Sequence, residues 1–283
     1  MVSIFLVVEL YPIIYVISCS FSDPDAVNAG RVLLFPRGFT LDGYKRVLEY
    51  RDIWLGYANT VFYTVVGTCI NLAVTLPCAY ALSKKDVAGR KYIMIFFMIT
   101  MYIGGGLIPE YLNVKSFGLL DTRAVLVTLG ALSVYNMIVA RTFFSESIPY
   151  EITEAAKIDG CNEFSIFFKI VMPLSKAIVG VMVLYYGIGH WNSYFSAMIY
   201  LDDRGKFPLQ IFLREILLQS KMLTESAGTA TSMEEMARME EMARSADLIK
   251  YCIIIVSSLP IMVIYPRLQK YFEKGVLIGS VKG

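Results

Sequence analysis

The chain has 283 residues, of which 56% are hydrophobic and only 18% are charged. This composition is too apolar for an ordinary soluble domain and predicts a membrane protein. The net charge of +2 gives no bulk attraction to nucleic acid. The five cysteines are scattered and lack the spacing of a disulfide framework or a zinc site.

Apolar runs of about 20 residues are long enough to cross roughly 30 Å of hydrocarbon as helices. Six such runs predict an all-α, polytopic fold that forms a single transmembrane domain over residues 1–283. The expected spans cover about 2–19, 58–82, 92–109, 124–144, 177–200 and 248–265. The first run lacks the basic flank and cleavage site of a signal peptide. It begins at Met1 without a preceding tail, which leaves a truncated or alternative start open.

Prolines and glycines mark interruptions in these runs. Pro12 breaks the first run, and Pro77 is expected to kink the second. Gly104-Gly105-Gly106 in the third predicts a bend or a close helix contact. The polar, turn-rich segment 20–54 is expected to lie outside the membrane, with a short helix around 41–50.

Basic residues in the loops predict the orientation. The loop 84–91 carries four Lys or Arg in eight residues. Together with 145–176 and 266–283, this side has 11 Lys and Arg in 58 residues, against 13 in 95 on the other side. Because cytoplasmic loops carry the excess of basic residues, both termini are expected in the cytoplasm.

Segment 149–173 has the local signals of a helix–turn–helix. Pro149 suits the first turn of a helix, because its missing N–H has no partner there. Gly160 can adopt the left-handed conformation that ends a helix. Asn162 is a good N-cap for a second short helix.

The same segment resembles the EAA loop of ABC-importer permeases. Glu154-Ala155-Ala156 is followed after three residues by Gly160, then after nine residues by Ile170, and Pro173 closes the pattern. In that family the loop is a coupling helix that fits a cleft on a cytoplasmic ATPase. The alternative is a cytoplasmic amphipathic hairpin with a chance Glu-Ala-Ala.

The resemblance implies roles for individual residues. Glu154 would pair with a basic residue of the ATPase, the alanines would allow close approach, and the phenylalanines would supply an apolar grip. The full set of implied coupling residues is Glu154, Ala155, Ala156, Asp159, Gly160, Phe164, Phe167, Phe168, Ile170 and Pro173.

Other motifs narrow the resemblance to carbohydrate permeases. Trp191-Asn192, Phe207-Pro208-Leu209-Gln210 and the ending from Tyr265 to Gly283 look like the maltose-type second permease subunit, within the oligosaccharide and polysaccharide-product branch. The resemblance implies a bacterial inner or plasma membrane location. It also implies a second permease, two ATPase subunits and an extracytoplasmic solute-binding protein as partners.

No phosphate-binding P-loop motif occurs, so ATP and Mg are expected on the partner ATPase, and no cofactor on this chain. His190 is the single histidine, which leaves no basis for a catalytic triad or a His-based metal site. No catalytic residue is therefore assigned, and the chain is interpreted as a transport subunit that is not itself an enzyme.

Sugars are usually held by aromatic faces and hydrogen-bonding side chains. Candidates for the substrate path are Tyr135, Asn136, His190, Trp191, Asn192 and Tyr194. The alternative is that Trp191 and Tyr194 anchor the chain at the membrane interface and that Asn192 bonds between helices.

The predicted outer loop 201–247 contains a tandem repeat, MEEMARMEEMAR, at 233–244. Its strong helix formers and Glu/Arg pairs predict a surface helix. Contact with a solute-binding protein is expected in 201–232 rather than in the repeat. A stand-alone secondary transporter, a membrane-bound enzyme and an ABC permease for a non-sugar solute remain as alternatives.

Overall fold

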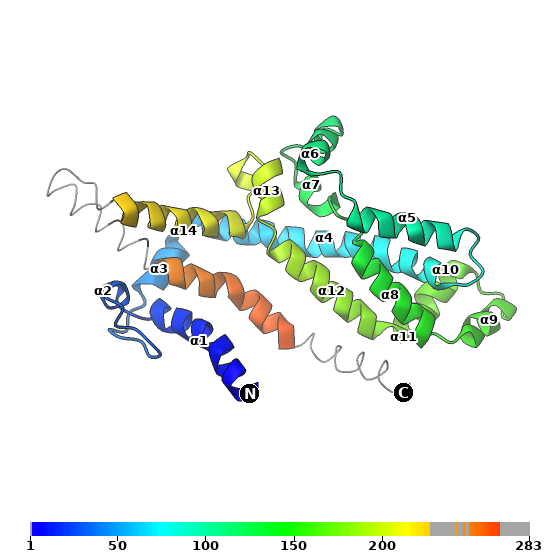
Figure 1. Ribbon diagram of the computed structural model, residues 1–283, viewed down its shortest axis with the longest axis horizontal. Coiled ribbons are helices and arrows are strands. Elements are labelled where there is room, and N and C mark those ends of the chain that lie inside the picture. Colours follow the sequence, from blue (N-terminus) through cyan, green and yellow to red (C-terminus); the bar gives the residue numbers. More distant parts are fainter. Residues whose placement is uncertain (1, 227–241, 243–245, 247–248, 267–283) are drawn as a thin grey trace. The chain divides into compact units, whose positions relative to one another are not determined.

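The computed structural model describes residues 2–226, 242, 246 and 249–266, and every regular element in these ranges is a helix (Figure 1). The expected all-α fold is thus confirmed for the described part of the chain. The repeat at 233–244, apart from Met242, and the tail 267–283 lie outside the described residues.

The N-terminal half contains α1 (Val2–Ser20), α2 (Pro24–Asn28), α3 (Asp42–Glu49), α4 (Arg51–Ser83), α5 (Arg90–Tyr102), α6 (Leu107–Ser116), α7 (Arg123–Thr128) and α8 (Val134–Ser147). Then follow α9 (Tyr150–Ile158), α10 (Glu163–Ile166), a π-helical turn (Phe167–Val171), α11 (Met172–Leu174), α12 (Lys176–Trp191), α13 (Phe195–Tyr200), a 3-10 turn (Arg204–Lys206) and α14 (Leu209–Ser226). A further helix covers Ile249–Pro266.

Two of these helices are long and apolar enough to cross a membrane by themselves, α4 and Ile249–Pro266. Two bent pairs also qualify: α5 with α6, bent by 113°, and Glu163–Leu174 with α12, bent by 84°. Among the described residues, length and composition therefore support up to four spans. The apolar helix Phe5–Ser20 is shorter. The chain is a multi-pass membrane protein.

The structure differs from the sequence prediction in three of the spans. Residues 177–200 are divided, because α12 ends at Trp191 and α13 begins at Phe195. Residues 92–109 do not form one helix, because α5 ends at Tyr102 and Gly106 has a φ of 85°. The bend predicted from the three glycines is thus confirmed. Residues 124–144 are interrupted between α7 and α8, where Gly130 has a φ of 71°. Pro12, in contrast, lies inside a continuous α1, and the predicted short helix near 41–50 is α3.

The chain packs as two compact units. Unit 1 contains residues up to Asn59 together with those from Phe207 to Met262, and unit 2 contains Thr60–Lys206 and the segment that begins at Val263. The core of unit 1 is apolar and contains Val47, Ile53, Leu209, Ile216, Cys252 and Ile253. Gly56 permits a close approach of two helices in this unit, since a Cβ there would lie 2.9 Å from the Leu209 Cα.

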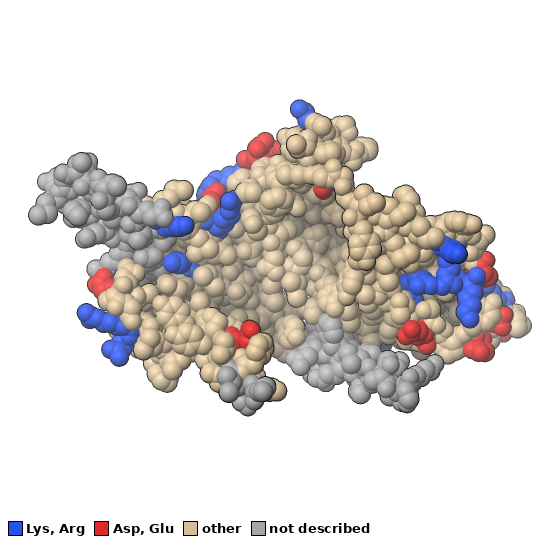
Figure 2. All heavy atoms as spheres, viewed as in Figure 1, with Lys and Arg blue, Asp and Glu red and all other residues tan. Residues whose placement is uncertain are grey.

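Unit 2 carries the site described below. Its core joins side chains of α4, α8, α10 and α12, among them Tyr80, Met137, Ile166 and Met182. Helix α8 packs against both α5 and α12, and α13 packs against α7. On the face drawn in Figure 2, the charged side chains of this unit gather around α9 and α10 and around α6 and α13. The surface between these two ends is largely uncharged, as expected where a helical bundle faces lipid.

Candidate functional site

The helix–turn–helix of 149–173 forms from short-range interactions. Helix α9 follows Pro149 and ends at Ile158, and Gly160 then takes a φ of 81°. The Asn162 Oδ1 accepts a hydrogen bond from the Ser165 N–H at 2.8 Å, which caps α10. The local predictions for Gly160 and Asn162 are therefore confirmed.

Packing divides the residues implied in coupling into two groups. Ala156 and Phe167 are each 6% exposed and belong to the core of unit 2, where the Phe167 ring lies 5.2 Å from that of Tyr80. Ile170 is partly buried against the same core. The side chains or surfaces that remain exposed belong to Glu154, Ala155, Asp159, Gly160, Phe164, Phe168 and Pro173. Only this second group is available for contact with another protein.

Two large apolar side chains are highly exposed on the helix–turn–helix of residues 149–173, which we call the elbow. Phe164 is 77% exposed, and Ile158, which the motif did not single out, is 86% exposed. Exposed apolar side chains that cluster beside charged groups are typical of protein interaction sites. The exposure of Ile158, at the last position of α9 before the turn, could not be inferred from the motif.

An ion-pair network fastens the elbow to the end of α4. Glu163, the first residue of α10, pairs with Lys84 and with Lys157, the latter at 2.9 Å. The Lys84 ammonium also lies 4.7 Å from the centre of the Tyr80 ring. Hydrogen bonds from Lys84 and Lys157 lower the pKa of the Glu163 carboxyl, and the bond to Glu163 raises the pKa of Lys157. Sequence analysis did not identify this network, because its members come from different elements.

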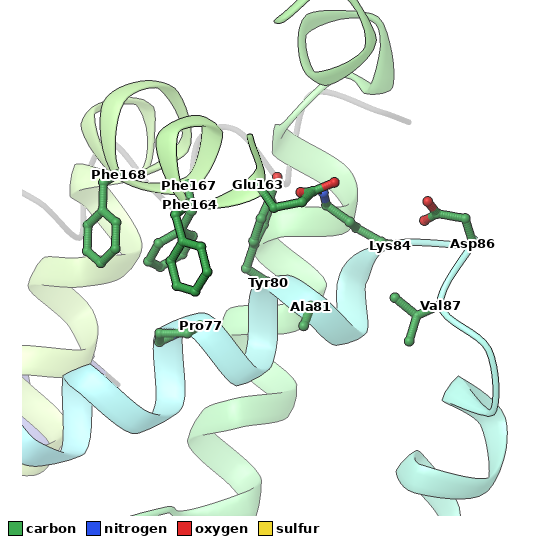
Figure 3. Close-up of a pocket in the computed structure, with 10 residues that line it drawn as sticks. All are labelled: Pro77, Tyr80, Ala81, Lys84, Asp86, Val87, Glu163, Phe164, Phe167 and Phe168. Atoms are coloured by element: carbon green, nitrogen blue, oxygen red, sulfur yellow. The ribbon is translucent and has the colours of Figure 1, made fainter. Parts of the chain in front are cut away.

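A cavity of about 420 Å³ lies where α10 faces the end of α4. Figure 3 shows the rings of Phe164, Phe167 and Phe168 directed toward the α4 residues Pro77 and Tyr80. Lys84 and Glu163 close one end of this cavity. Apolar contacts with α4 and the Lys84–Glu163 ion pair thus hold the second helix of the elbow against α4.

A second cavity, of about 290 Å³, lies in unit 2 between α4, α8 and α12. Its lining includes Asn71, Ser133, Asn136, Tyr186 and His190, and it contains no Lys, Arg, Asp or Glu. The His190 Nε2 lies 2.7 Å from the Asn71 Oδ1. The cavity is therefore polar but uncharged.

Side chains that line this cavity also form hydrogen bonds with the non-helical backbone between α7 and α8. The Asn71 amide donates to the carbonyl oxygens of Gly130 at 3.1 Å and Ala131 at 2.9 Å. The Tyr186 hydroxyl accepts from the Ser133 N–H at 3.2 Å and lies 2.7 Å from the Thr75 Oγ1. Non-helical backbone at membrane depth is tolerated only where such partners or a cavity satisfy it.

Of the predicted substrate-path residues, the structure places two in this cavity, Asn136 and His190. Trp191 is buried, with 6% of its surface exposed, and does not line it. Tyr135, Asn192 and Tyr194 are exposed and also lie outside its lining. Sequence analysis missed Asn71, Ser133 and Tyr186, although a polar residue inside an apolar run was an available signal for Asn71.

No group of three or more His, Cys, Asp or Glu side chains able to hold a metal ion occurs in the part of the chain that the structure describes.

Comparison with known proteins gives a consistent result. The family described as "Binding-protein-dependent transport system inner membrane component" matches residues 53–278. The chain is 38% identical to the polygalacturonan/rhamnogalacturonan transport system permease protein YtcP of Bacillus subtilis, over 99% of this chain and 94% of that one. It is 39% identical to protein LplC of Bacillus subtilis, over 98% of this chain and 90% of LplC.

A solved structure resembles the chain over nearly its whole length. It is the crystal structure of a bacterial ABC transporter involved in the import of the acidic polysaccharide alginate. The match has a TM-score of 0.84 and 36% sequence identity, and it covers 96% of this chain and 93% of the matched chain.

Proposed function

Because this chain belongs to the family of inner membrane components of binding-protein-dependent transport systems, we propose that segment 149–173 is the joint through which separate ATPase subunits drive it. The chain is a permease subunit of an ABC importer for carbohydrate and not an enzyme. Family membership decides against the alternatives of a stand-alone secondary transporter and a membrane-bound enzyme.

One observation carries the coupling proposal. The elbow leaves Ile158 and Glu154 exposed, and Phe164 is 77% exposed although its ring faces the cavity beside α4, while Phe167 and Ala156 fix the elbow to the core of unit 2. A segment that is apolar outside and fastened inside transmits force as a rigid lever. ATP-driven closure of the ATPase pair would move this lever and reorient the spans.

The partners follow from the same proposal. Two ATPase subunits hold ATP and Mg²⁺, and a second, homologous permease completes the pathway. An extracytoplasmic solute-binding protein delivers the sugar, with its contact in 201–232. Segment 1–283 acts as one transmembrane domain of six spans in a bacterial inner or plasma membrane. Its termini and residues 149–173 face the cytoplasm, which the basic loop 84–91 supports.

We further propose an oligosaccharide released from a polysaccharide as the substrate. The names of two similar proteins support a uronate-containing substrate, since YtcP is named for polygalacturonan and rhamnogalacturonan transport and the solved transporter is involved in the import of alginate. The alternative of an ABC permease for a non-sugar solute is not favoured, because these similar proteins are named for carbohydrate transport.

Charge reversal on α9 tests the coupling role. In the complete transporter, Glu154→Lys is expected to leave the subunits assembled or weakly associated and to abolish uptake, because a positive charge would face the basic partner of Glu154. Glu151→Lys is the matched control, since Glu151 is also an exposed acidic residue of α9 but lies outside the motif. Co-purification and uptake into proteoliposomes are the measurements, and wild-type uptake by the Glu154 variant would refute the role.

A further inference from the structure

The cavity between α4, α8 and α12 contains two asparagines in opposite situations. The Asn71 amide is fully engaged, with two backbone carbonyls and His190 as partners. Asn136 is only 8% exposed, and its side-chain amide makes no hydrogen bond to any residue that the structure describes. Its backbone N–H, in contrast, is bonded to the Ser133 Oγ at 3.4 Å.

The Asn136 amide lines the cavity and has no protein partner there among the described residues, so its hydrogen-bonding groups are available to water or to a ligand. The cavity of about 290 Å³ is large for a single bridging water, because one water occupies about 30 Å³ in the liquid. It lies close to the lower end of the range of small-molecule pockets, about 300 to 1,000 Å³. The space therefore suits one ring-sized group better than a lone water.

The engaged side chains define what the ring-sized group would meet. Both N–H groups of Asn71 are committed to the carbonyls of Gly130 and Ala131, so its oxygen faces His190 and accepts from the Nε2–H. In the neutral imidazole, Nδ1 is then an acceptor. The free amide of Asn136 offers both donors and an acceptor. Sugar hydroxyls both donate and accept, which matches this set.

Charge decides which part of the sugar fits. No cationic side chain lines the cavity, so a carboxylate would enter it without an ion-pair partner. Burial of an unpaired carboxylate is strongly unfavourable. A uronate ring would therefore present its hydroxyls here and keep its carboxylate elsewhere.

We propose that the cavity between α4, α8 and α12 binds the hydroxyl-bearing face of one sugar ring of the transported oligosaccharide, with Asn136 as the residue that contacts it. Asn71 is a positioning residue that holds His190 and the α7–α8 break. The inference rests on the proposed function, because it assigns a substrate contact to a carbohydrate permease.

The test compares wild-type and Asn136→Ala transporters, purified as the complete complex in proteoliposomes. The probes are trigalacturonate and its methyl ester, which share hydroxyls but differ in charge. The half-saturating concentration for uptake is expected to rise about five- to tenfold for both probes, as expected for the loss of hydrogen bonds to one amide. The ratio between the two probes should stay unchanged.

A stability measurement separates ligand contact from folding. Asn136→Ala removes no hydrogen bond of its side chain, so the melting temperature of the sugar-free complex is expected to stay level or rise. Asn71→Ala breaks three bonds and should lower it. An unchanged half-saturating concentration in Asn136→Ala would overturn the inference, and so would a loss confined to the charged probe.

The result also distinguishes this inference from the proposed function. Wild-type uptake of the probes combined with an unaffected Asn136→Ala variant would overturn the sugar contact alone. Failure of the wild-type transporter to take up either probe would overturn the proposed substrate class, and the inference with it.

Discussion

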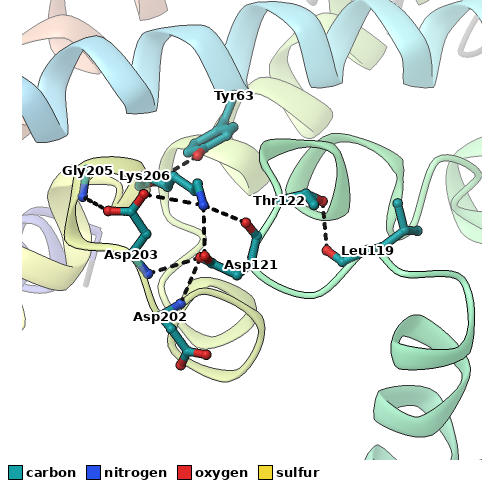
Figure 4. Close-up of polar contacts among 8 residues, drawn as sticks. All are labelled: Tyr63, Leu119, Asp121, Thr122, Asp202, Asp203, Gly205 and Lys206. Atoms are coloured by element: carbon teal, nitrogen blue, oxygen red, sulfur yellow. Dashed lines mark hydrogen bonds and ion pairs between the residues drawn. The ribbon is translucent and has the colours of Figure 1, made fainter.

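The Lys206 ammonium donates hydrogen bonds to two oxygen atoms of Asp121, the carboxylate Oδ2 at 2.8 Å and the backbone carbonyl oxygen at 2.7 Å (Figure 4). The other carboxylate oxygen of Asp121 accepts the N–H groups of Asp202 at 3.1 Å and Asp203 at 3.0 Å. Asp121 has a φ of 52°, which is unusual for a residue other than glycine. One carboxylate thus joins the turn before α7 to the segment after α13.

The Asp121 pKa predicts a pH-dependent contribution to stability. The hydrogen bond from Lys206 and those from the two backbone N–H groups lower the pKa from 3.8 to about 2. Because the folded pKa is depressed, the contribution is fully present above the unfolded value of about 3.9 and is lost as pH falls toward about 2. Asp121→Asn should therefore melt at a lower temperature than the wild type at neutral pH, and the difference should shrink below about pH 4.

Asparagine is the suitable replacement because it also tolerates a positive φ, so the backbone is not strained by the change. Melting curves of the detergent-purified complex at several pH values measure the difference. A gap between the two proteins that stays constant from pH 7 to the acid limit would contradict the electrostatic explanation.

Removal of the Lys84 charge should loosen the elbow. Lys84→Gln breaks the ion pair with Glu163, whose side chain is about half exposed, so the cost in stability is at most about 1 kcal/mol. The expected functional effect is larger, because α10 loses its charged link to α4. We predict several-fold less sugar imported per ATP hydrolysed, measured by uptake and phosphate release in the same proteoliposomes.

The neighbouring Lys85 provides the control. It is exposed and forms no ion pair with any residue that the structure describes. Lys85→Gln removes the same charge from the same loop and should leave the ratio of sugar to ATP as in the wild type. An equal fall in sugar imported per ATP in both variants would indicate a general effect of loop charge and not a specific effect of the Lys84–Glu163 ion pair.

Gly67 allows His190 to lie directly against α4. A Cβ at Gly67 would come within 2.4 Å of the His190 Nε2, so Gly67→Ala must displace the imidazole and break its bond to Asn71. Overpacking of this kind typically costs about 1–3 kcal/mol. A lower melting temperature and reduced uptake are expected.

Gly187 on α12 is the matched control for this substitution. A Cβ there meets its nearest atom, the Thr68 Oγ1, at 3.9 Å, which is ordinary contact. Gly187→Ala should change the melting temperature little, since no side chain has to move. Comparable destabilisation by both substitutions would contradict displacement of His190 as the cause, because Ala is favoured over Gly inside a helix.

The sequence alone determined the features that depend on near neighbours. Gly160 and Asn162 set the turn and the cap of the elbow through contacts within a few residues, and the three glycines after α5 set its end. The spacing from Glu154 to Pro173 and the apolar composition were sufficient to indicate the family, which the relatives confirm.

Only the tertiary structure decided which side of the elbow is buried and how the interior cavity is built. Phe164, Phe167 and Phe168 look alike in the sequence, but the position of Tyr80 on α4 buries Phe167 and leaves the other two exposed. Asn71 and His190 are 119 residues apart, and Asn71 lies 59 residues from Gly130. Such pairs form because helices pack together and because the backbone of an interrupted span needs hydrogen-bond partners. The spacing of residues along the sequence predicts neither of these.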